Sequence, residues 1–271
     1  MKAAIIVTTY NRPDALTAVL EGYCGQTDRD FELIVADDGS TGETAEVVKE
    51  FTARNLYSLR HVWQEDRGFR AAAIRNRAVA STNADYLIFT DGDCVPSLGF
   101  VKAHKRMAEP GFFLGGNRVL LGPSFTSRVL GERIPIHGWR WTDWAQSWLR
   151  REVNRLLPLM LLPDGSFRKW MPDRWDGIKT CNLSLWREDL VHVNGLDESY
   201  GGWGLEDSDL IIRLLRAGVK HKSARFAAPV FHLWHEGQDR GRLPENQKRL
   251  DDLFASNDIR AAIGLDQYGS A

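Results

Sequence analysis

The chain has 271 residues, of which 43% are hydrophobic and 26% charged, and this is enough for one large globular domain. Its net charge of −1 gives no basic field, so nucleic acid is not expected as a partner. Three widely separated cysteines without metal-ligand spacing indicate a reducing compartment, and the apolar run Ala3–Val7 is too short for a signal peptide or membrane span. These features predict a cytoplasmic protein whose only membrane contact would be peripheral, at the inner face.

The first part of the chain alternates strand and helix signals. Apolar residues at i, i+3, i+4 and i+7 predict helices around Leu16–Tyr23 and Thr44–Phe51. Short runs without alternation are typical of parallel strands buried on both faces, and they occur at Ala3–Val7, Phe31–Ala36, Leu59–Val62, Tyr86–Thr90 and Phe112–Leu114. The pattern predicts an α/β fold with a doubly wound, mostly parallel sheet, in which ligands bind beyond the carboxyl ends of the strands.

The rest of the chain divides into three stretches. Residues 123–176 hold six of the ten tryptophans together with clustered arginines such as Arg150, Arg151 and Arg155, and we expect helices there that cover the sheet. A helix at Ser208–Ala217, closed by Gly218, is predicted in the following stretch. The polar tail from Glu236 is expected to become helical from Pro244 to Ala255.

Polar clusters follow three of the predicted strands. They are Thr8–Arg12, Asp37–Ser40 and Asp91–Cys94. One acidic turn after a strand is often only a turn or a helix cap. Three clusters at one edge of one sheet instead predict a nucleotide pocket with a divalent metal ion.

The spacing of Asp91 and Asp93 suits a metal site that serves a diphosphate. Residues two apart in an extended segment face the same way, so one carboxylate can hold Mn²⁺ or Mg²⁺ while the other reaches ribose or a metal-bound water. The chain has no P-loop and no G-x-G-x-x-G motif, which disfavours the corresponding nucleotide-binding folds.

Several segments resemble glycosyltransferase family 2, whose members have the GT-A fold. They are Thr8–Arg12, Ile34–Thr44 (IVADDGSTGET), Gln64–Ala78 (QEDRGFRAAAIRNRA) and Phe89–Cys94 (FTDGDC). Asn182–Gly218 and Val230–Glu236 (VFHLWHE) are similar to the carboxyl-terminal region of family 7 galactosyltransferases and of bacterial polysaccharide and lipopolysaccharide glycosyltransferases. The resemblance covers most of residues 3–118 and 177–236, and it implies a nucleotide-sugar-binding half (1–118) and an acceptor-binding and catalytic half (177–235). The residue pattern of the other stretches predicts a helical Trp-rich insertion (119–176) and a lid with a carboxyl-terminal helix (236–271).

The resemblance also implies a role for each motif residue. Asp93 binds the metal, and one of His232 and His235 completes the metal shell. Glu206 and Asp207 face the acceptor hydroxyl, with Asp207 as the catalytic base, and Trp203 forms a platform for a sugar. The donor-binding residues are Thr8, Tyr10, Asn11, Arg12, Asp38, Arg67 and Asp91, with Tyr10 stacking on the base. The chain departs from the family pattern at Leu205, where glycine is usual.

Structural alternatives stand beside these roles. Trp203 can belong to the core, and Glu206 and Asp207 can simply cap the next helix, whose N-terminus favours acids. Each histidine can be an ordinary surface residue, and Cys94 is expected to pack rather than to react. Other arginines of the Gln64–Ala78 segment, Arg70 and Arg75, can be solvated or can contact a phosphate.

Taken together, the motifs and the resemblance imply an inverting, metal-dependent glycosyltransferase that uses a nucleotide-sugar, and the resemblance favours UDP as the nucleotide. The expected acceptor is a glycan or glycolipid of a capsule or lipopolysaccharide. A nucleotidyltransferase and a nucleotide-sugar-binding module without transfer are the alternatives. Two segments carry further hypotheses: residues 123–176 either cover the core or meet a membrane interface, and Glu236–Leu243 is a lid whose Arg240 and Arg242 close over the diphosphate.

Overall fold

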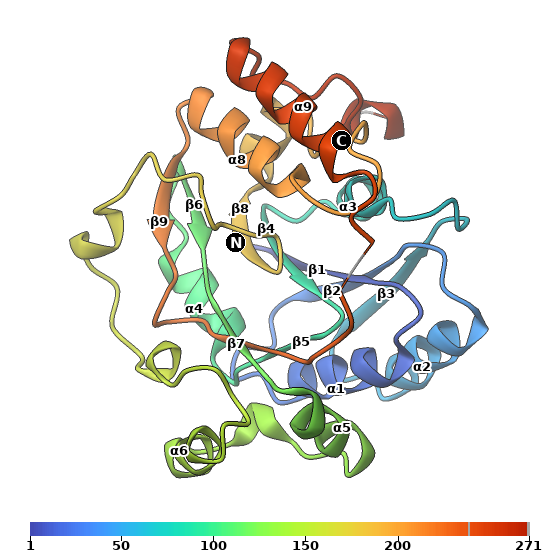
Figure 1. Cartoon of the computed structure of the whole chain (residues 1–271), viewed down its shortest axis with the longest axis vertical. Helices are drawn as coiled ribbons and strands as arrows, with labels where there is room; N and C mark the ends of the chain where they lie inside the picture. The colour runs from blue at the N-terminus through green and yellow to red at the C-terminus, as the bar shows by residue number, and fades with distance from the viewer. Residues whose placement is uncertain (238, 270–271) are drawn as a thin grey trace.

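A twisted seven-stranded sheet forms the centre of the computed structural model, which describes residues 1–237 and 239–269 (Figure 1). β8 runs antiparallel to both neighbours, whereas the other neighbouring pairs are parallel. The doubly wound, mostly parallel sheet predicted from the sequence is thereby confirmed. The order across the sheet is β3 (Ser58–Trp63), β2 (Glu32–Asp37), β1 (Ala3–Thr9), β4 (Tyr86–Asp91), β8 (Asn182–Trp186), β6 (Phe112–Gly115) and β9 (Lys220–Ser223).

The continuous apolar runs correctly predict burial on both faces for β1, β2 and β4. The same expectation is wrong for β3, whose residues are partly or fully exposed. β3 is the last strand of the sheet, so it has a strand neighbour on one side only.

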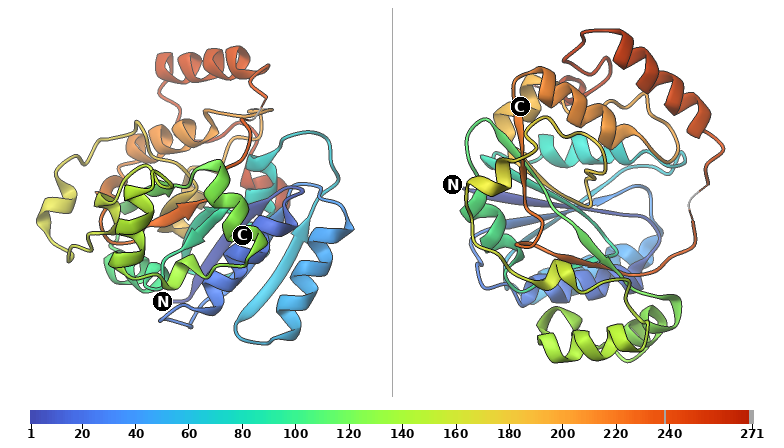
Figure 2. Two further views of the ribbon diagram at one scale, coloured as in Figure 1. Left: turned by 60° about the horizontal axis from the view of Figure 1, so that its bottom comes forward. Right: turned by 60° about the vertical axis from the view of Figure 1, so that its left-hand side comes forward.

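Helices cover both faces of the sheet (Figure 1, Figure 2). Successive residues of β1 serve opposite cores, because Ile5 and Val7 pack into one and Ala4 and Ile6 into the other. The first core is completed by α1 (Pro13–Cys24), α2 (Gly42–Ala53) and α4 (Phe100–Met107). The second core is completed by α3 (Ala71–Ala80), α7 (Arg187–His192) and α8 (Glu206–Arg216).

The predicted carboxyl-terminal helices form close to their expected bounds. α8 begins two residues before the predicted start and ends before Gly218, whose φ of +92° suits glycine. α9 (Leu243–Ala255) packs on α8, where Ile212 meets Leu250 and Leu253 in a small separate core. A short 3₁₀ turn at Leu265–Tyr268 follows α9.

A second, three-stranded sheet lies beside the main one. It consists of β5 (Cys94–Pro96), β10 (Val230–His232) and β7 (Arg118–Leu120), with β10 in the middle. α5 (Pro123–Gly131), a 3₁₀ turn at Ile136–Gly138 and α6 (Trp141–Leu149) follow β7. Trp144 of α6 stacks on Phe231 of β10 with ring centroids 4.3 Å apart, so this part of the insertion covers the small sheet.

Beyond α6 the structure differs from the expectation of helices throughout residues 123–176. The helical elements within residues 150–176 are two 3₁₀ turns, at Leu157–Leu159 and Ser166–Lys169. Within the described residues, no helix is both long enough and apolar enough to cross a membrane.

Candidate active site

The three predicted polar clusters meet because their strands are neighbours. β1 lies between β2 and β4, and its register pairs Thr8 with Asp91 and Thr9 with Asp37. Two backbone hydrogen bonds join the residues that follow β4 and β2 to the end of β1. Gly92 N–H donates to the carbonyl of Thr8 at 2.7 Å, and Asp38 N–H donates to that of Thr9 at 3.0 Å.

The glycine between the two acids of the metal motif has a packing reason. A Cβ added at Gly92 would lie 2.8 Å from Oγ1 of Thr9 and 3.1 Å from the carbonyl oxygen of Thr8. The turn that carries Asp91 and Asp93 can therefore press against β1 only where no side chain intervenes.

One cavity of about 400 Å³ brings the predicted residues together. It is lined by Thr8, Tyr10, Arg12, Asp38, Asp91, Asp93, Trp203, Glu206, Asp207, His232 and His235. Asn11 and Arg67 are not among the described residues that line this cavity. Asn11 accepts a hydrogen bond from Thr41 N–H at 2.9 Å, whereas Arg67 pairs at 2.7 Å with Glu65.

Arg75, for which the sequence allowed either a solvated position or a phosphate contact, is buried and lines this cavity. Its guanidinium donates to Oγ1 of Thr8 at 3.0 Å, to Asp91 at 3.1 Å and to Glu206 at 3.4 Å. The solvated alternative is thus wrong, because α3 is buried on nearly all sides. Its run of small residues, AAAIRNRAVA, is a signal of such burial that sequence reasoning missed.

Burial shifts the carboxylates that contact Arg75. It raises the pKa of Asp91 to about 6, although Arg75 acts in the opposite direction. Burial and the neighbouring charge of Asp207 likewise raise the pKa of Glu206 to about 7, against the effect of Arg75. Oε2 of Glu206 is buried, and it has no hydrogen-bond partner among the described residues. The site therefore has an acceptor atom that a bound hydroxyl can satisfy.

Asp207 is held by the segment just before β8. The hydroxyl of Thr180 donates to its Oδ1 at 2.6 Å, and the Thr180 N–H donates to the same oxygen at 3.3 Å. Nζ of Lys179 lies 3.8 Å from Oδ2. One oxygen is therefore fixed by two hydrogen bonds, while the other faces a flexible cation.

The loop before α8 has an unusual backbone that α9 holds in place. Gly202, Gly204 and Leu205 have φ values of +72°, +108° and +78°. The side chain of Asn246, buried on α9, donates to the carbonyl oxygens of Gly201 and Gly204 at 3.2 and 3.0 Å. Leu205 takes the left-handed conformation that favours glycine, while its side chain packs against the small core between α8 and α9. Compared with the usual glycine, Leu205 therefore adds backbone strain and gains an apolar contact.

Asp93 lies among possible metal ligands from the small sheet. β10 pairs antiparallel with β5 and sets His232 opposite Cys94. Nε2 of His235 and of His232 lie 3.4 and 3.7 Å from Oδ2 of Asp93. One ligand atom each of Asp93, Cys94 and His232 lie within 4.8 Å of one another. Burial lowers the pKa of His232, so its ring is neutral at neutral pH, the form that binds metals. Cys94 is fully buried, as expected.

Asp38 and Tyr10 also line the cavity. Asp38 is buried and accepts hydrogen bonds from the Gln64 amide at 2.5 Å and from Arg70 N–H at 2.7 Å. Tyr10 is half exposed, and its hydroxyl donates to Asp66 at 2.9 Å. The ring of Tyr10 is therefore accessible to a molecule that enters the cavity.

Trp203 is partly exposed and lines the cavity, so the core alternative does not describe it. The guanidinium of Arg240 lies 5.1 Å from the centroid of the Trp203 ring. Arg240 belongs to the predicted lid Glu236–Leu243, of which Gln238 lies outside the described residues. Arg242 pairs with Glu245 at 3.0 Å and packs over Gly201 and Gly202.

The fold and the site define the GT-A class of glycosyltransferases, and comparison with known proteins gives the family. The model of glycosyl transferase family 2 matches residues 4–162, so the chain belongs to this family. A second family model, described as the N-terminal domain of galactosyltransferase, matches residues 166–236. The resemblance that the sequence motifs indicate is confirmed.

Curated relatives match most of this chain. Validoxylamine A glucosyltransferase of Streptomyces hygroscopicus is 30% identical over 229 residues, which cover 80% of this chain and 52% of that protein. Hyaluronan synthase of Pasteurella multocida is 36% identical over 245 residues, covering 81% of this chain and 23% of that protein. Chondroitin synthase of Escherichia coli is 25% identical over 255 residues, covering 87% and 35%. The chain thus spans about half the length of these relatives, or less.

Solved structures share the fold. TarS of Staphylococcus aureus in complex with UDP-GlcNAc superposes with a TM-score of 0.64 and 16% identity, covering 99% of this chain and 69% of that one. The mannosyltransferase PcManGT of Pyrobaculum calidifontis in complex with GDP-Man and Mn²⁺ gives a TM-score of 0.57 and 19% identity, covering 93% and 61%. The likeness confirms the GT-A fold.

Proposed function

We propose that this protein is an inverting glycosyltransferase that moves a sugar from a UDP-sugar to a hydroxyl of a glycan acceptor, with Mn²⁺ or Mg²⁺ as cofactor. One observation carries the proposal. A single buried guanidinium, that of Arg75, contacts Asp91 of the predicted metal motif and Glu206 of the predicted acceptor side. The two halves of the proposed chemistry therefore share one cavity.

Asp207 is the proposed general base. Because Thr180 donates two hydrogen bonds to Oδ1, Oδ2 is left to accept the proton of an attacking hydroxyl. The hydroxyl oxygen forms a bond to the anomeric carbon as the bond from that carbon to the nucleoside diphosphate breaks. A single displacement inverts the anomeric configuration, and the proton ends on Asp207.

Glu206 is proposed to position the acceptor. Its buried Oε2 has no hydrogen-bond partner in the described part of the chain, and leaving it unsatisfied costs about 1–3 kcal/mol. A hydroxyl of the acceptor ring that donates to Oε2 would remove this cost. Trp203 offers a flat apolar surface beside it, which suits the apolar face of a sugar.

The residues around Asp93 fit a divalent ion. A carboxylate with one or two neutral imidazoles suits Mn²⁺, and the close approach of His232 and His235 to Asp93 supports this set. When bound, the ion would supply positive charge to the leaving diphosphate. Asp93 and one histidine would hold it, Asp91 would face ribose and the metal shell, and Arg12 lies in the same cavity.

UDP is the proposed nucleotide because the TarS structure, which has the same fold, contains UDP-GlcNAc. Tyr10 would stack on the base, and Asp38 would accept from it. A glycan acceptor is supported by the hyaluronan and chondroitin synthases among the relatives, and we propose a capsule or lipopolysaccharide chain.

The test measures the products formed from UDP-sugars with Mn²⁺, in the presence and absence of glycan acceptors. Release of UDP that requires both Mn²⁺ and an acceptor is the expected result. A parallel reaction is supplied with UTP and a sugar 1-phosphate, from which a nucleotidyltransferase forms a UDP-sugar and releases pyrophosphate; that release would assign the site to a nucleotidyltransferase. Tight UDP-sugar binding without UDP release, across a panel of acceptors, would indicate a binding module and overturn the proposal.

A further inference from the structure

Residues 149–171 expose apolar side chains on one flank of the molecule. We call Leu149, Leu157, Met160, Leu161, Trp170 and Met171 the apolar flank; their exposed fractions include 75% for Leu149, 68% for Leu161 and 86% for Trp170. The segment follows the left-hand edge in Figure 1 and comes forward in the right-hand view of Figure 2. Clustered apolar exposure of this kind marks an interaction surface.

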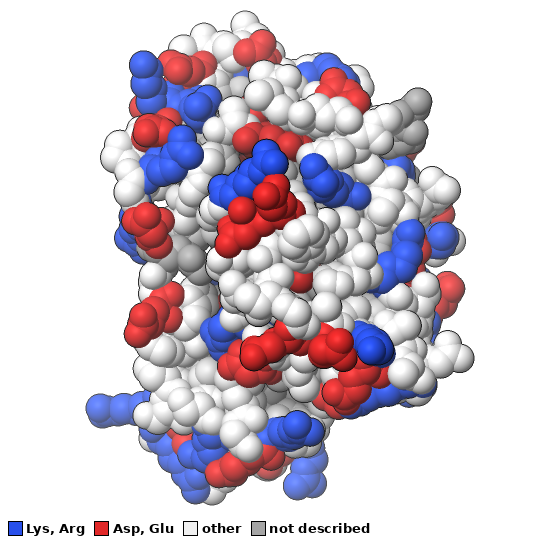
Figure 3. Space-filling model, turned by 90° about the vertical axis from the view of Figure 1, so that its right-hand side faces the viewer, with Lys and Arg blue, Asp and Glu red and all other residues white. Residues whose placement is uncertain are grey.

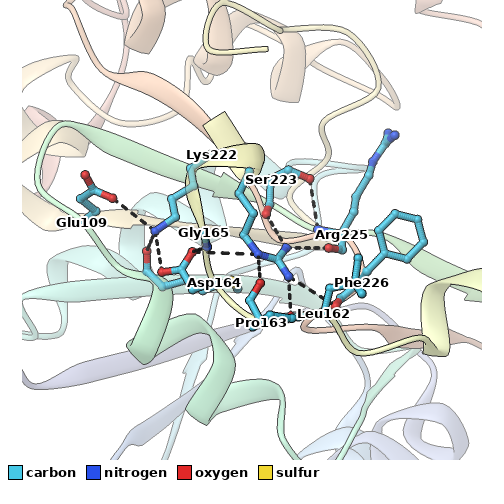
Figure 4. Close-up of polar contacts among 11 residues, drawn as sticks. Glu109, Leu162, Pro163, Asp164, Gly165, Lys222, Ser223, Arg225 and Phe226 are labelled. Carbon is cyan, nitrogen blue, oxygen red and sulfur yellow. Dashed lines mark hydrogen bonds and ion pairs between the residues drawn. The ribbon is translucent and has the colours of Figure 1, made fainter. Parts of the chain in front are cut away.

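The backbone that carries these exposed side chains is held in place by buried polar contacts. Arg168, a buried residue of this segment, donates to the carbonyl oxygens of Leu162, Pro163, Ser223 and Arg225 at 2.6 to 2.9 Å (Figure 4). Lys222, also buried, pairs with Asp164 at 3.0 Å and with Glu109 at 3.2 Å. The segment is thus tied to β9 by its polar groups, while its apolar side chains are left facing outward.

The charges beside the apolar flank are unbalanced. Arg150, Arg151 and Arg155 are exposed, and none of them forms an ion pair with a residue in the described ranges. The acids of residues 149–176 are already paired: Glu152 with Arg128, Asp164 with Lys222, Asp173 with Lys220 and Asp176 with Arg174. By contrast, the side on the right in Figure 1 intersperses both signs of charge (Figure 3).

We propose that the apolar flank docks on a membrane surface that carries anionic phospholipids. Tryptophan and leucine side chains enter the boundary between headgroups and acyl chains, and arginines meet lipid phosphates. Charge complementarity favours this occupant, because the uncompensated charge beside the flank is positive. The proposal does not depend on the transferase chemistry, since the flank contributes no residue that lines the active-site cavity.

The experiment is flotation of the whole protein with two kinds of vesicle, phosphatidylcholine alone and phosphatidylcholine with about 30% phosphatidylglycerol. Each is run in about 0.05 M and 0.5 M NaCl. We expect association with the anionic vesicles at low salt, a large loss at high salt, and little association with phosphatidylcholine. Loss of one arginine should lower the partition coefficient about fivefold, because a cation near such a surface contributes about 1 kcal/mol.

The test variant is Arg150→Gln with Leu161→Ser, and its matched control is Lys49→Gln with Leu56→Ser. Both pairs remove one exposed cation and one exposed leucine, but Lys49 and Leu56 lie in and after α2, on the right in Figure 1. We expect at least a fivefold loss for the first pair and parental partitioning for the second. All four positions are exposed, so circular dichroism should show an unchanged fold.

Three results would overturn the proposal. One is the absence of association with anionic vesicles at low salt. The second is an equal loss in both double variants, which would mean that the flank is not the contact. The third is a concentration-dependent dimer that Leu161→Ser dissociates, which would assign the flank to a protein contact.

Discussion

Replacing Arg75 by leucine should destabilise the protein in a way that depends on pH. The change leaves Asp91, Glu206 and Oγ1 of Thr8 without their shared partner. Removing one partner of a buried ion pair costs about 3–5 kcal/mol, because the remaining charge stays buried and unpaired. That full cost applies only while the carboxylates are ionised.

The direction of the pH dependence follows from the raised pKa values of these two acids. An acid whose pKa is higher in the folded than in the unfolded state lowers the free energy of unfolding progressively as pH rises from its unfolded value. In the parent these folded values are about 6 for Asp91 and about 7 for Glu206. Without Arg75 both should rise further, so the loss should be about 3–5 kcal/mol at pH ~8 and about 1–2 at pH ~5.

Urea unfolding of the metal-free protein at the two pH values, followed by tryptophan fluorescence, measures both losses. Arg54→Leu is the control, since Arg54 pairs with the exposed Glu21 and Glu50 and should cost about 1 kcal/mol or less at either pH. Arg75→Lys should lie between parent and Arg75→Leu, because lysine keeps the charge but lacks the fork of donors. An equal loss for Arg75→Leu at both pH values would refute the reasoning.

Other predictions concern catalysis, metal binding and the loop. Asp207→Asn should lower turnover by about 10²–10⁴ with donor affinity nearly unchanged, and near-parental turnover at saturating substrates would place the base elsewhere. Glu206→Gln should instead raise the acceptor KM more than it lowers kcat. In calorimetry with UDP and Mn²⁺, His232→Ala should cost far more affinity than His235→Ala, and equal mild losses would exclude both as ligands. Leu205→Gly should relieve about 1 kcal/mol of backbone strain but lose the apolar contact with α9, so chemical denaturation should show a net decrease in the free energy of unfolding. A more stable variant would mean that the strain outweighs the packing.

Local signals predicted the sheet well, because the runs of β1, β2 and β4 carry their burial in their own composition. The exposure of β3 could not be predicted this way, since an edge position depends on which strand has no second neighbour. The same limit applies to residues 150–176. Their tryptophans and arginines suggested helices that cover the sheet. In the structure, the buried Arg168 holds this segment by hydrogen bonds to backbone carbonyl groups, and leucine and tryptophan side chains are left exposed.

Within the site, sequence motifs predicted the functional residues that directly follow strands. They did not predict site residues that come from the middle of a helix or from segments without a motif. Arg75 comes from the middle of a helix, where an arginine is usually solvated, and only the packing of α3 on both sides fixes its burial. Thr180 and Asn246 carry no motif. They touch Asp207 and the Gly201–Gly204 loop through the tertiary fold alone.

The hydrogen bonds of Asn246 have a consequence for proteins assembled from exchanged parts. Both family matches end by residue 236, yet the helix that steadies the Gly201–Gly204 loop begins at Leu243. A hybrid joined to a relative's tail at the family boundary would keep every motif residue and still lose the support beneath them. Natural variation in the tail should accordingly be constrained at Asn246 and freer at exposed neighbours such as Gln247, although neither residue is among those that line the active-site cavity in the described part of the chain.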